Sequence, residues 1–335
     1  MNIRSFVKPA SIFFFLCLSF QLYSQKTYSY QSPQADYDNA MDLYNKGKYG
    51  SALEIFDALS QSENSNLKAG SGYFASLCAA RLFHPDATQR MEKFISTYPQ
   101  NAQVNEAWFE LGKQYFLNKD YHKTLGSFKQ LDRYELNSDQ LSEYFFKSGY
   151  SYLKLDNLAK ARESFALVKD KPGKFNVPAN YYYGYVCYQE KNYETALQHF
   201  EKVDSDETFR DVVGFYIVQI YSIQGKYDEL LSKALPLLQK GDDKKAAEIS
   251  RLTGDAYYHK KQYKEALEYF KKFQSSNPRT ISRNDQYEMG FTSYQAGNYP
   301  EAIKQFQQLA VNQDSLSQNA FYHLGDCYLK TNQKR

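Results

Sequence analysis

The sequence predicts an all-α protein, built as a solenoid of repeated helix–turn–helix units. Three observations predict this class. One pattern of small and aromatic residues recurs nine times, turn residues separate the two halves of most copies, and alanine and phenylalanine are often spaced four apart. The clearest copies run from Trp108 to Phe128 and from Gly254 to Pro278. A period of about 20–50 residues is typical of solenoids, so we expect a stacked array in place of a single core.

A small residue marks the first helix of nearly every copy. Two helices are expected to cross closely there, because a larger side chain would hold them apart. The intervals between successive positions are 38, 34, 37, 35, 34, 36, 36 and 35 residues. The nine positions are Ala40, Cys78, Gly112, Gly149, Gly184, Val218, Gly254, Gly290 and Gly325.

A phenylalanine follows the small residue by 16 positions in most copies, often with an alanine four residues before it. Residues at i and i+4 share one helix face, so the alanine admits a neighbouring helix and the ring fills the space beside it. The sixth copy departs from this pattern at Val218, Leu230 and Ala234, and Pro236 lies in its expected second helix. A kink or a change of superhelical pitch is expected there. The phenylalanines are Phe56, Phe94, Phe128, Phe165, Phe200, Phe270 and Phe306.

This pattern resembles the tetratricopeptide repeat (TPR) family, whose unit is about 34 residues long. The resemblance implies a right-handed superhelical solenoid of helix–turn–helix repeats over residues 35–335, with about eight full repeats and the first helix of a ninth. The last copy reaches Tyr328 and has no second helix before Arg335. We therefore expect the N-terminal part of a longer array, or a chain with a frayed end.

Residues 1–24 have the features of a secretory signal peptide. Arg4 and Lys8 precede an apolar run over residues 12–20, and the small residue Ser24 follows it. The run is short for a transmembrane helix, and an uncleaved N-terminal anchor is the alternative. Residues 25–34 are polar and are predicted to form a flexible leader. The expected location is the periplasm or the outer-membrane surface.

Composition excludes several classes of function. The 41 basic and 38 acidic residues give a net charge of +3, which argues against a nucleic-acid partner because such proteins need clustered positive charge. The five histidines are scattered, without a pair at i and i+4 on one helix. We therefore predict no catalytic, cofactor-binding or metal site, and a protein that is not an enzyme. Cys78, Cys187 and Cys327 fall in separate repeats and are expected to be buried small hydrophobes.

The resemblance also implies a ligand surface. In the TPR family, the first-helix positions three before the small residue, and one, four and five after it, face a concave groove. Aromatic side chains dominate these positions here, which suits extended or helical peptides. The alternative is that the rings pack against the adjacent repeat. The candidate groove residues are Phe109, Lys113, Phe116, Phe146, Tyr150, Tyr181, Tyr185, Tyr188, Phe215, Tyr258, Tyr287, Phe291 and Tyr294. The polar residues among them include Lys154, Gln189, Gln219, Asp255, His259 and Gln295.

The predicted function is a non-catalytic scaffold in the bacterial cell envelope that captures a peptide or protein partner in this groove. The chain is similar to periplasmic TPR proteins that work with outer-membrane assembly or division machinery, which implies a peripheral association with such machinery. One rival is a carbohydrate-binding or uptake accessory protein that uses the aromatic rows on glycans. A second is an enzyme with a catalytic domain beyond Arg335. The partner and the oligomeric state stay open.

Overall fold

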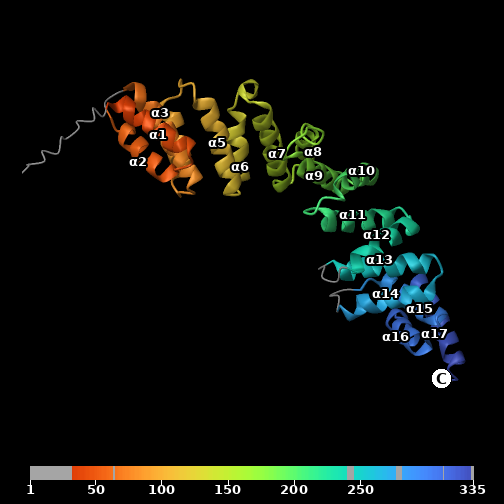
Figure 1. The fold of residues 1–335 in the computed structure, drawn as a ribbon. Helices are drawn as coiled ribbons and strands as arrows, with labels where there is room; N and C mark the ends of the chain where they lie inside the picture. Colours follow the sequence, from red (N-terminus) through yellow and green to blue (C-terminus); the bar gives the residue numbers. More distant parts are fainter. Residues whose placement is uncertain (1–31, 63–64, 240–244, 277–280, 312, 333–335) are drawn as a thin grey trace, which may run out of the picture. The chain divides into compact units, whose positions relative to one another are not determined.

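The computed structural model describes residues 32–62, 65–239, 245–276, 281–311 and 313–332. The predicted signal peptide, residues 1–24, and most of the predicted leader, residues 25–34, lie outside these ranges. The described chain is entirely helical, with 17 α-helices and one short 3-10 helix, which confirms the all-α class (Figure 1).

The helices are α1 (Pro33–Asn45), α2 (Tyr49–Ser60), α3 (Ser65–Arg81), α4 (Ala87–Thr97), α5 (Val104–Leu117), α6 (Tyr121–Lys129), η1 (Arg133–Glu135), α7 (Ser138–Lys154), α8 (Leu158–Ala166), α9 (Asn176–Gln189), α10 (Tyr193–Val203), α11 (Arg210–Ile223), α12 (Tyr227–Gln239), α13 (Ala246–His259), α14 (Tyr263–Ser275), α15 (Arg283–Gln295), α16 (Tyr299–Leu309) and α17 (Ser315–Lys330).

The chain divides into two compact units between His84 and Pro85, and each is described by itself. In the first unit, α1, α2 and α3 pack around Ala40, Ala52 and Phe56, all of which are fully buried. In the second unit, each helix packs on the next along the chain. First helices of neighbouring repeats also touch, as α5 does with α7 and α13 with α15. Contacts confined to neighbours in the chain define a solenoid.

A glycine packed against a phenylalanine joins the two helices of most repeats. A Cβ atom added to Gly254 would lie 2.7 Å from the Phe270 ring, and one added to Gly149 would lie 2.9 Å from the Phe165 ring. Both rings are fully buried. A larger side chain would have to displace a packed aromatic ring, so the predicted reason for a small residue is confirmed.

The sixth repeat exchanges the sizes at this contact. Val218 stands at the small-residue position and Ala234 at the phenylalanine position, and both are fully buried in one cluster. A different close approach occurs nearby, because a Cβ added to Gly214 would lie 2.9 Å from Leu237. Helix α12 continues through Pro236 to its last residue. The sixth repeat departs from the common pattern, as the sequence predicted, and an exchange of large and small side chains keeps its core filled.

A residue with left-handed backbone ends the first helix of each repeat. It lies seven positions after the small residue in eight repeats, and its φ is +73° at Gly47 and +67° at Gly225. Lysine stands in the same place in other repeats, with a φ of +61° at Lys191 and +59° at Lys261. The left-handed conformation costs a residue with a Cβ about 1–2 kcal/mol, so these lysines carry strain that the glycines avoid.

The cysteines of the described chain are free and buried, as predicted, and burial raises the pKa of each thiol to about 11. They are Cys78, Cys187 and Cys327. None of the described helices combines the length and the apolar character needed to cross a membrane.

Lys261→Gly is expected to stabilise the protein by about 1 kcal/mol, because glycine adopts a positive φ without strain. The matched control is Lys271→Gly in the middle of α14, where the lost backbone entropy should cost about 1 kcal/mol. Thermal unfolding of both variants beside the parent measures the two effects. A loss of stability in both variants would show that Lys261 is not strained.

The exchange seen in the sixth repeat can be copied into the seventh. Gly254→Val should cost about 1–3 kcal/mol through overpacking, and Phe270→Ala about 3–5 kcal/mol through a cavity. In the double variant the valine enters that cavity, so the combined loss should fall short of the sum by about 1–2 kcal/mol. Unfolding free energies of the four proteins give the coupling. Additive losses would mean that the two positions do not share one packing volume.

Candidate functional site

The first helices of the second unit bring the predicted groove residues together in rows of rings. Register positions are counted from the small residue of each repeat, so that position +1 comes directly after it. The Phe116 and Tyr150 ring centroids lie 5.4 Å apart across α5 and α7, and those of Tyr258 and Phe291 lie 6.0 Å apart across α13 and α15. Both pairs join position +4 of one repeat to position +1 of the next. The register therefore aligns side chains across repeat boundaries.

The rings of α9 converge on Tyr216 of α11. Tyr185 lies 5.7 Å and Tyr188 5.0 Å from the Tyr216 ring, measured between centroids. Tyr216 in turn stacks on the fully buried Phe200 at 5.3 Å. These tyrosines are half-buried, and burial raises the pKa of the Tyr188 and Tyr216 hydroxyls. Each ring thus packs between repeats and still keeps part of its surface open.

Phe109 is a correction to the predicted groove. Its side chain is only 1% exposed and stacks on Phe128 with 6.0 Å between ring centroids. Leu136 belongs to the same buried cluster and lies in the connection after α6. This connection belongs to a repeat of 37 residues, and the added length supplies an apolar residue that packs with Phe109. Phe109 is therefore core and offers no ring to a partner.

The other predicted groove residues are neither fully buried nor fully exposed. They lie on α5, α7, α9, α11, α13 and α15 as Lys113, Phe116, Phe146, Tyr150, Tyr181, Tyr185, Tyr188, Phe215, Tyr258, Tyr287, Phe291 and Tyr294. Their role in binding stays a prediction.

Lysine ammonium groups lie over several of these rings. The Nζ atom of Lys147 is 4.2 Å from the centroid of Phe116, and that of Lys154 is 5.2 Å from the centroid of Tyr150. Cation–π attraction holds a lysine beside a ring. Burial lowers the pKa of Lys147, whereas its ion-pair partner Glu143, 3.6 Å away, acts in the opposite direction. Positive charge is thus placed next to aromatic surface on α5 and α7.

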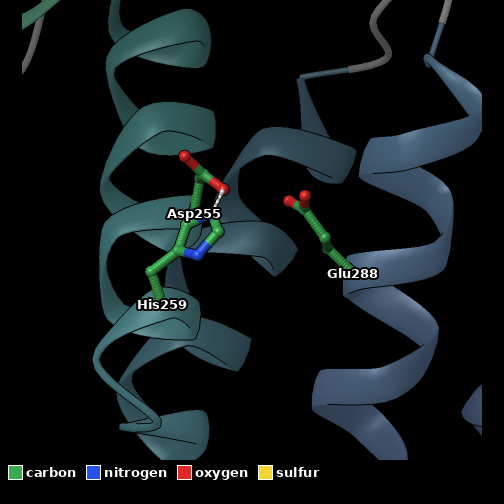
Figure 2. Close-up of side chains that lie close together, drawn as sticks. All are labelled: Asp255, His259 and Glu288. Atoms are coloured by element: carbon green, nitrogen blue, oxygen red, sulfur yellow. Dashed lines mark ion pairs between the residues drawn. The ribbon is translucent and has the colours of Figure 1, made fainter. Parts of the chain in front are cut away.

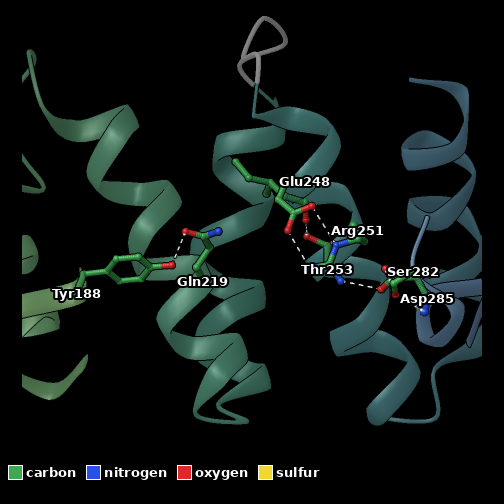
Figure 3. A network of polar contacts seen from close by, with 8 residues as sticks. Tyr188, Gln219, Glu248, Arg251, Thr253, Ser282 and Asp285 are labelled. Carbon is green, nitrogen blue, oxygen red and sulfur yellow. Dashed lines mark hydrogen bonds and ion pairs between the residues drawn. The ribbon is translucent and has the colours of Figure 1, made fainter. Parts of the chain in front are cut away.

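Polar contacts also cross the repeat boundaries (Figure 3). The Tyr188 hydroxyl donates to Gln219 Oε1 at 3.1 Å. The Tyr294 hydroxyl donates to Asp326 Oδ2 at 2.5 Å. Both bonds again run from +4 to the next +1. Arg251 donates to Glu248 and, across the boundary, to Asp285, each at 2.8 Å. At the Tyr188–Gln219 and Tyr294–Asp326 boundaries, a hydrogen bond therefore takes the place of a ring contact.

Three side chains with metal-binding atoms meet between α13 and α15 (Figure 2). His259 Nε2 is 3.2 Å from Asp255 Oδ1, and Glu288 points toward this pair from the facing helix. One ligand atom from each of the three lies within 4.8 Å of the others. Burial, followed by the adjacent Asp255 carboxylate, raises the pKa of Glu288 to about 8.

A family model described as Tetratricopeptide repeat matches residues 146–208, 224–279 and 288–334. The chain belongs to the tetratricopeptide repeat family. The matched residues include most of α7–α17, so they contain the greater part of the ring surface and the Asp255–His259–Glu288 cluster. No curated relative matched the chain.

Solved structures of other proteins are similar in fold to this chain. The apo form of RapI is 13% identical with a TM-score of 0.50, and the match covers 90% of this chain and 98% of RapI. A tetratricopeptide repeat protein from Parabacteroides merdae is 16% identical with a TM-score of 0.46, covering 78% and 99%. The type IV pilus biogenesis factor PilW is 19% identical with a TM-score of 0.42, covering 66% and 100%. At these identities the likeness concerns the fold alone.

The TPR register explains which residues of the cluster the sequence revealed. Asp255 at +1 and His259 at +5 are among the predicted groove positions, whereas Glu288 stands at −2 of the following repeat and was missed. A search for histidine pairs also overlooks a mixed pair, although Asp255 and His259 are spaced i and i+4 on one helix face. The i and i+4 spacing of Asp255 and His259 was therefore the feature of the sequence that could have indicated this cluster.

Proposed function

We propose that this TPR protein is a non-catalytic scaffold of the bacterial cell envelope that binds a segment of a partner protein along the first helices α5 to α15. The observation that carries the proposal is the set of half-buried rings held in place by their neighbours. Tyr185 and Tyr188, both packed on Tyr216, are examples. A ring already fixed by packing loses little conformational entropy on binding, which suits an anchor for apolar side chains.

Exposed polar side chains stand beside the rings and suit hydrogen bonding to a peptide backbone. Lys154, Gln189 and Gln295 are exposed at position +5 of three repeats. Their amide and ammonium groups provide donors or acceptors in the fourth, fifth and eighth repeats. An extended or helical segment lying across several repeats would meet both kinds of contact, which is the common logic of peptide recognition in grooves.

The cell-envelope part of the proposal is supported by the N-terminal sequence. The basic residues Arg4 and Lys8, the apolar run over residues 12–20 and the small residue Ser24 are features of an export signal. An exported scaffold would act on partners in the periplasm or at the outer membrane.

The mature protein is expected to begin at Gln25. Intact-mass measurement of the protein purified from an envelope fraction tests this directly. Leu16→Arg, which interrupts the apolar run, should leave the full-length precursor in the cytoplasm, because the signal would no longer insert. A full-length parent protein in the cytoplasm would contradict export.

Partner contact is expected on α9 and not on α10 of the fifth repeat. Gln189 and Gln198 are both exposed glutamines, one ending the first helix and one within the second. Each can be replaced by the photoreactive residue p-benzoylphenylalanine and irradiated in cells. We expect a discrete protein adduct from position 189 alone, because only that position lies beside the ring surface.

Adducts from both positions, or from 198 alone, would place the contact elsewhere. The same purified protein on glycan and peptide arrays separates the remaining alternative. Glycan binding without a protein adduct at position 189 would favour the carbohydrate-binding function.

A further inference from the structure

We propose that Asp255, His259 and Glu288 bind a divalent transition-metal ion, with zinc as the expected ion, between the first helices of the seventh and eighth repeats. The three side chains come from α13 and α15 and face one another (Figure 2). The site lies at one edge of the proposed partner surface but does not depend on a partner.

The donor atoms select the class of metal. The cluster offers one imidazole nitrogen and two carboxylate groups, a set that zinc accepts in tetrahedral sites. Calcium and magnesium prefer oxygen ligands alone, and soft ions prefer thiolates. The cysteines of the described chain are buried elsewhere and supply none of these donors. Zinc or a similar first-row ion is therefore the expected occupant.

The distances require little rearrangement. With metal–ligand bonds of about 2.0–2.1 Å, two tetrahedral ligands lie about 3.3–3.4 Å apart. His259 Nε2 and Asp255 Oδ1 already lie 3.2 Å apart, because positions i and i+4 meet on one helix face. All three ligand atoms lie within 4.8 Å, so Glu288 has to approach by about 1.5 Å at most. A glutamate side chain can move this far by rotamer changes.

At several other repeat boundaries the same junction is filled by aromatic rings. Position +1 meets position −2 of the next repeat, and Tyr150 and Tyr182 occupy these places with 5.1 Å between ring centroids. Phe291 and His323 do so at 5.0 Å. At the boundary of repeats seven and eight the two places hold Asp255 and Glu288. Two facing carboxylates at a partly buried junction are unfavourable unless a cation or a proton lies between them.

Nearby cations are engaged with other carboxylates. Arg251 pairs with Glu248 and Asp285, and Lys260 pairs with Asp228. Among the ion pairs of the described residues, Glu288 has no cationic partner and Asp255 has only His259. A divalent ion would bring positive charge to both carboxylates at once.

The exposed histidine ring packs against two tyrosines. Tyr227 of α12 stacks on His259 with 4.8 Å between centroids and an interplanar angle of 11°, and Tyr258 meets it edge-on at 5.3 Å. An oriented imidazole is an important requirement for a metal ligand. Three protein ligands leave a fourth position for water. On the proposed function, that position could also accept a carboxylate from a bound partner.

The test titrates zinc chloride into the metal-free full chain by isothermal titration calorimetry, with elemental analysis after dialysis. We expect a single zinc ion per chain and a raised thermal midpoint, because an ion bound only by the folded state stabilises it. Glu288→Gln and His259→Gln should each weaken binding by about tenfold or more. The matched control is His122→Gln, an exposed histidine on α6, which should bind zinc like the parent.

Glu288→Gln keeps the size of the side chain, and thermal unfolding of the metal-free variant beside the parent shows directly whether it is folded, so weak binding is separated from unfolding. Cobalt(II) provides an independent readout, since a nitrogen and oxygen site lacks the near-ultraviolet thiolate band. An absence of saturable zinc binding, an unchanged affinity in the Glu288→Gln/His259→Gln variant, or a thiolate band would each overturn the proposal. Crosslinking at position 189 is independent of all three results and tests the scaffold function alone.

Discussion

The contact between a glycine and a phenylalanine 16 residues later is the constraint on which most of this array depends. It fixes how closely the two helices of a repeat approach, and therefore the shape that the next repeat packs against. The sixth repeat shows that the constraint concerns volume more than residue identity. Val218 and Ala234 exchange the large and small partners and stay fully buried. The packing energy of a buried contact depends on the summed volume of its side chains. An exchange of large and small partners is therefore tolerated where a single change is not.

Because that contact positions most first helices in a similar way, the same register positions meet at successive boundaries. Position +4 reaches the next +1 whether the pair is two rings, as in Phe116 and Tyr150, or a hydrogen bond, as in Tyr188 and Gln219. The rings that could bind a partner are therefore also the rings that join repeats. Removing one changes stability and binding together, so exposed residues such as Gln189 report on binding more cleanly than the tyrosines do.

The features that repeat with the period of the sequence were predictable from it. The helical class, the small residues at close crossings and the buried cysteines all follow from local pattern. Features that arise where a single repeat departs from the common pattern could not be predicted from the sequence. Phe109 is buried because Leu136, in a longer connection, packs in the same cluster, and its register position alone suggests exposure. Glu288 joins Asp255 and His259 only through the packing of α15 against α13, which no single helix encodes.

Repetition also explains how a polar cluster can arise without any specialised loop. Positions +1 and −2 face each other at several boundaries, so two substitutions there place two new side chains in contact. Where both are aromatic, as in Tyr185 and Tyr216, the boundary is stabilised by ring packing. Asp255 and Glu288 give up that packing and face each other as carboxylates, with His259 one turn away. A cation bound at this boundary would offset the repulsion that arises when both carboxylates are ionised, which ring packing at other boundaries never has to overcome.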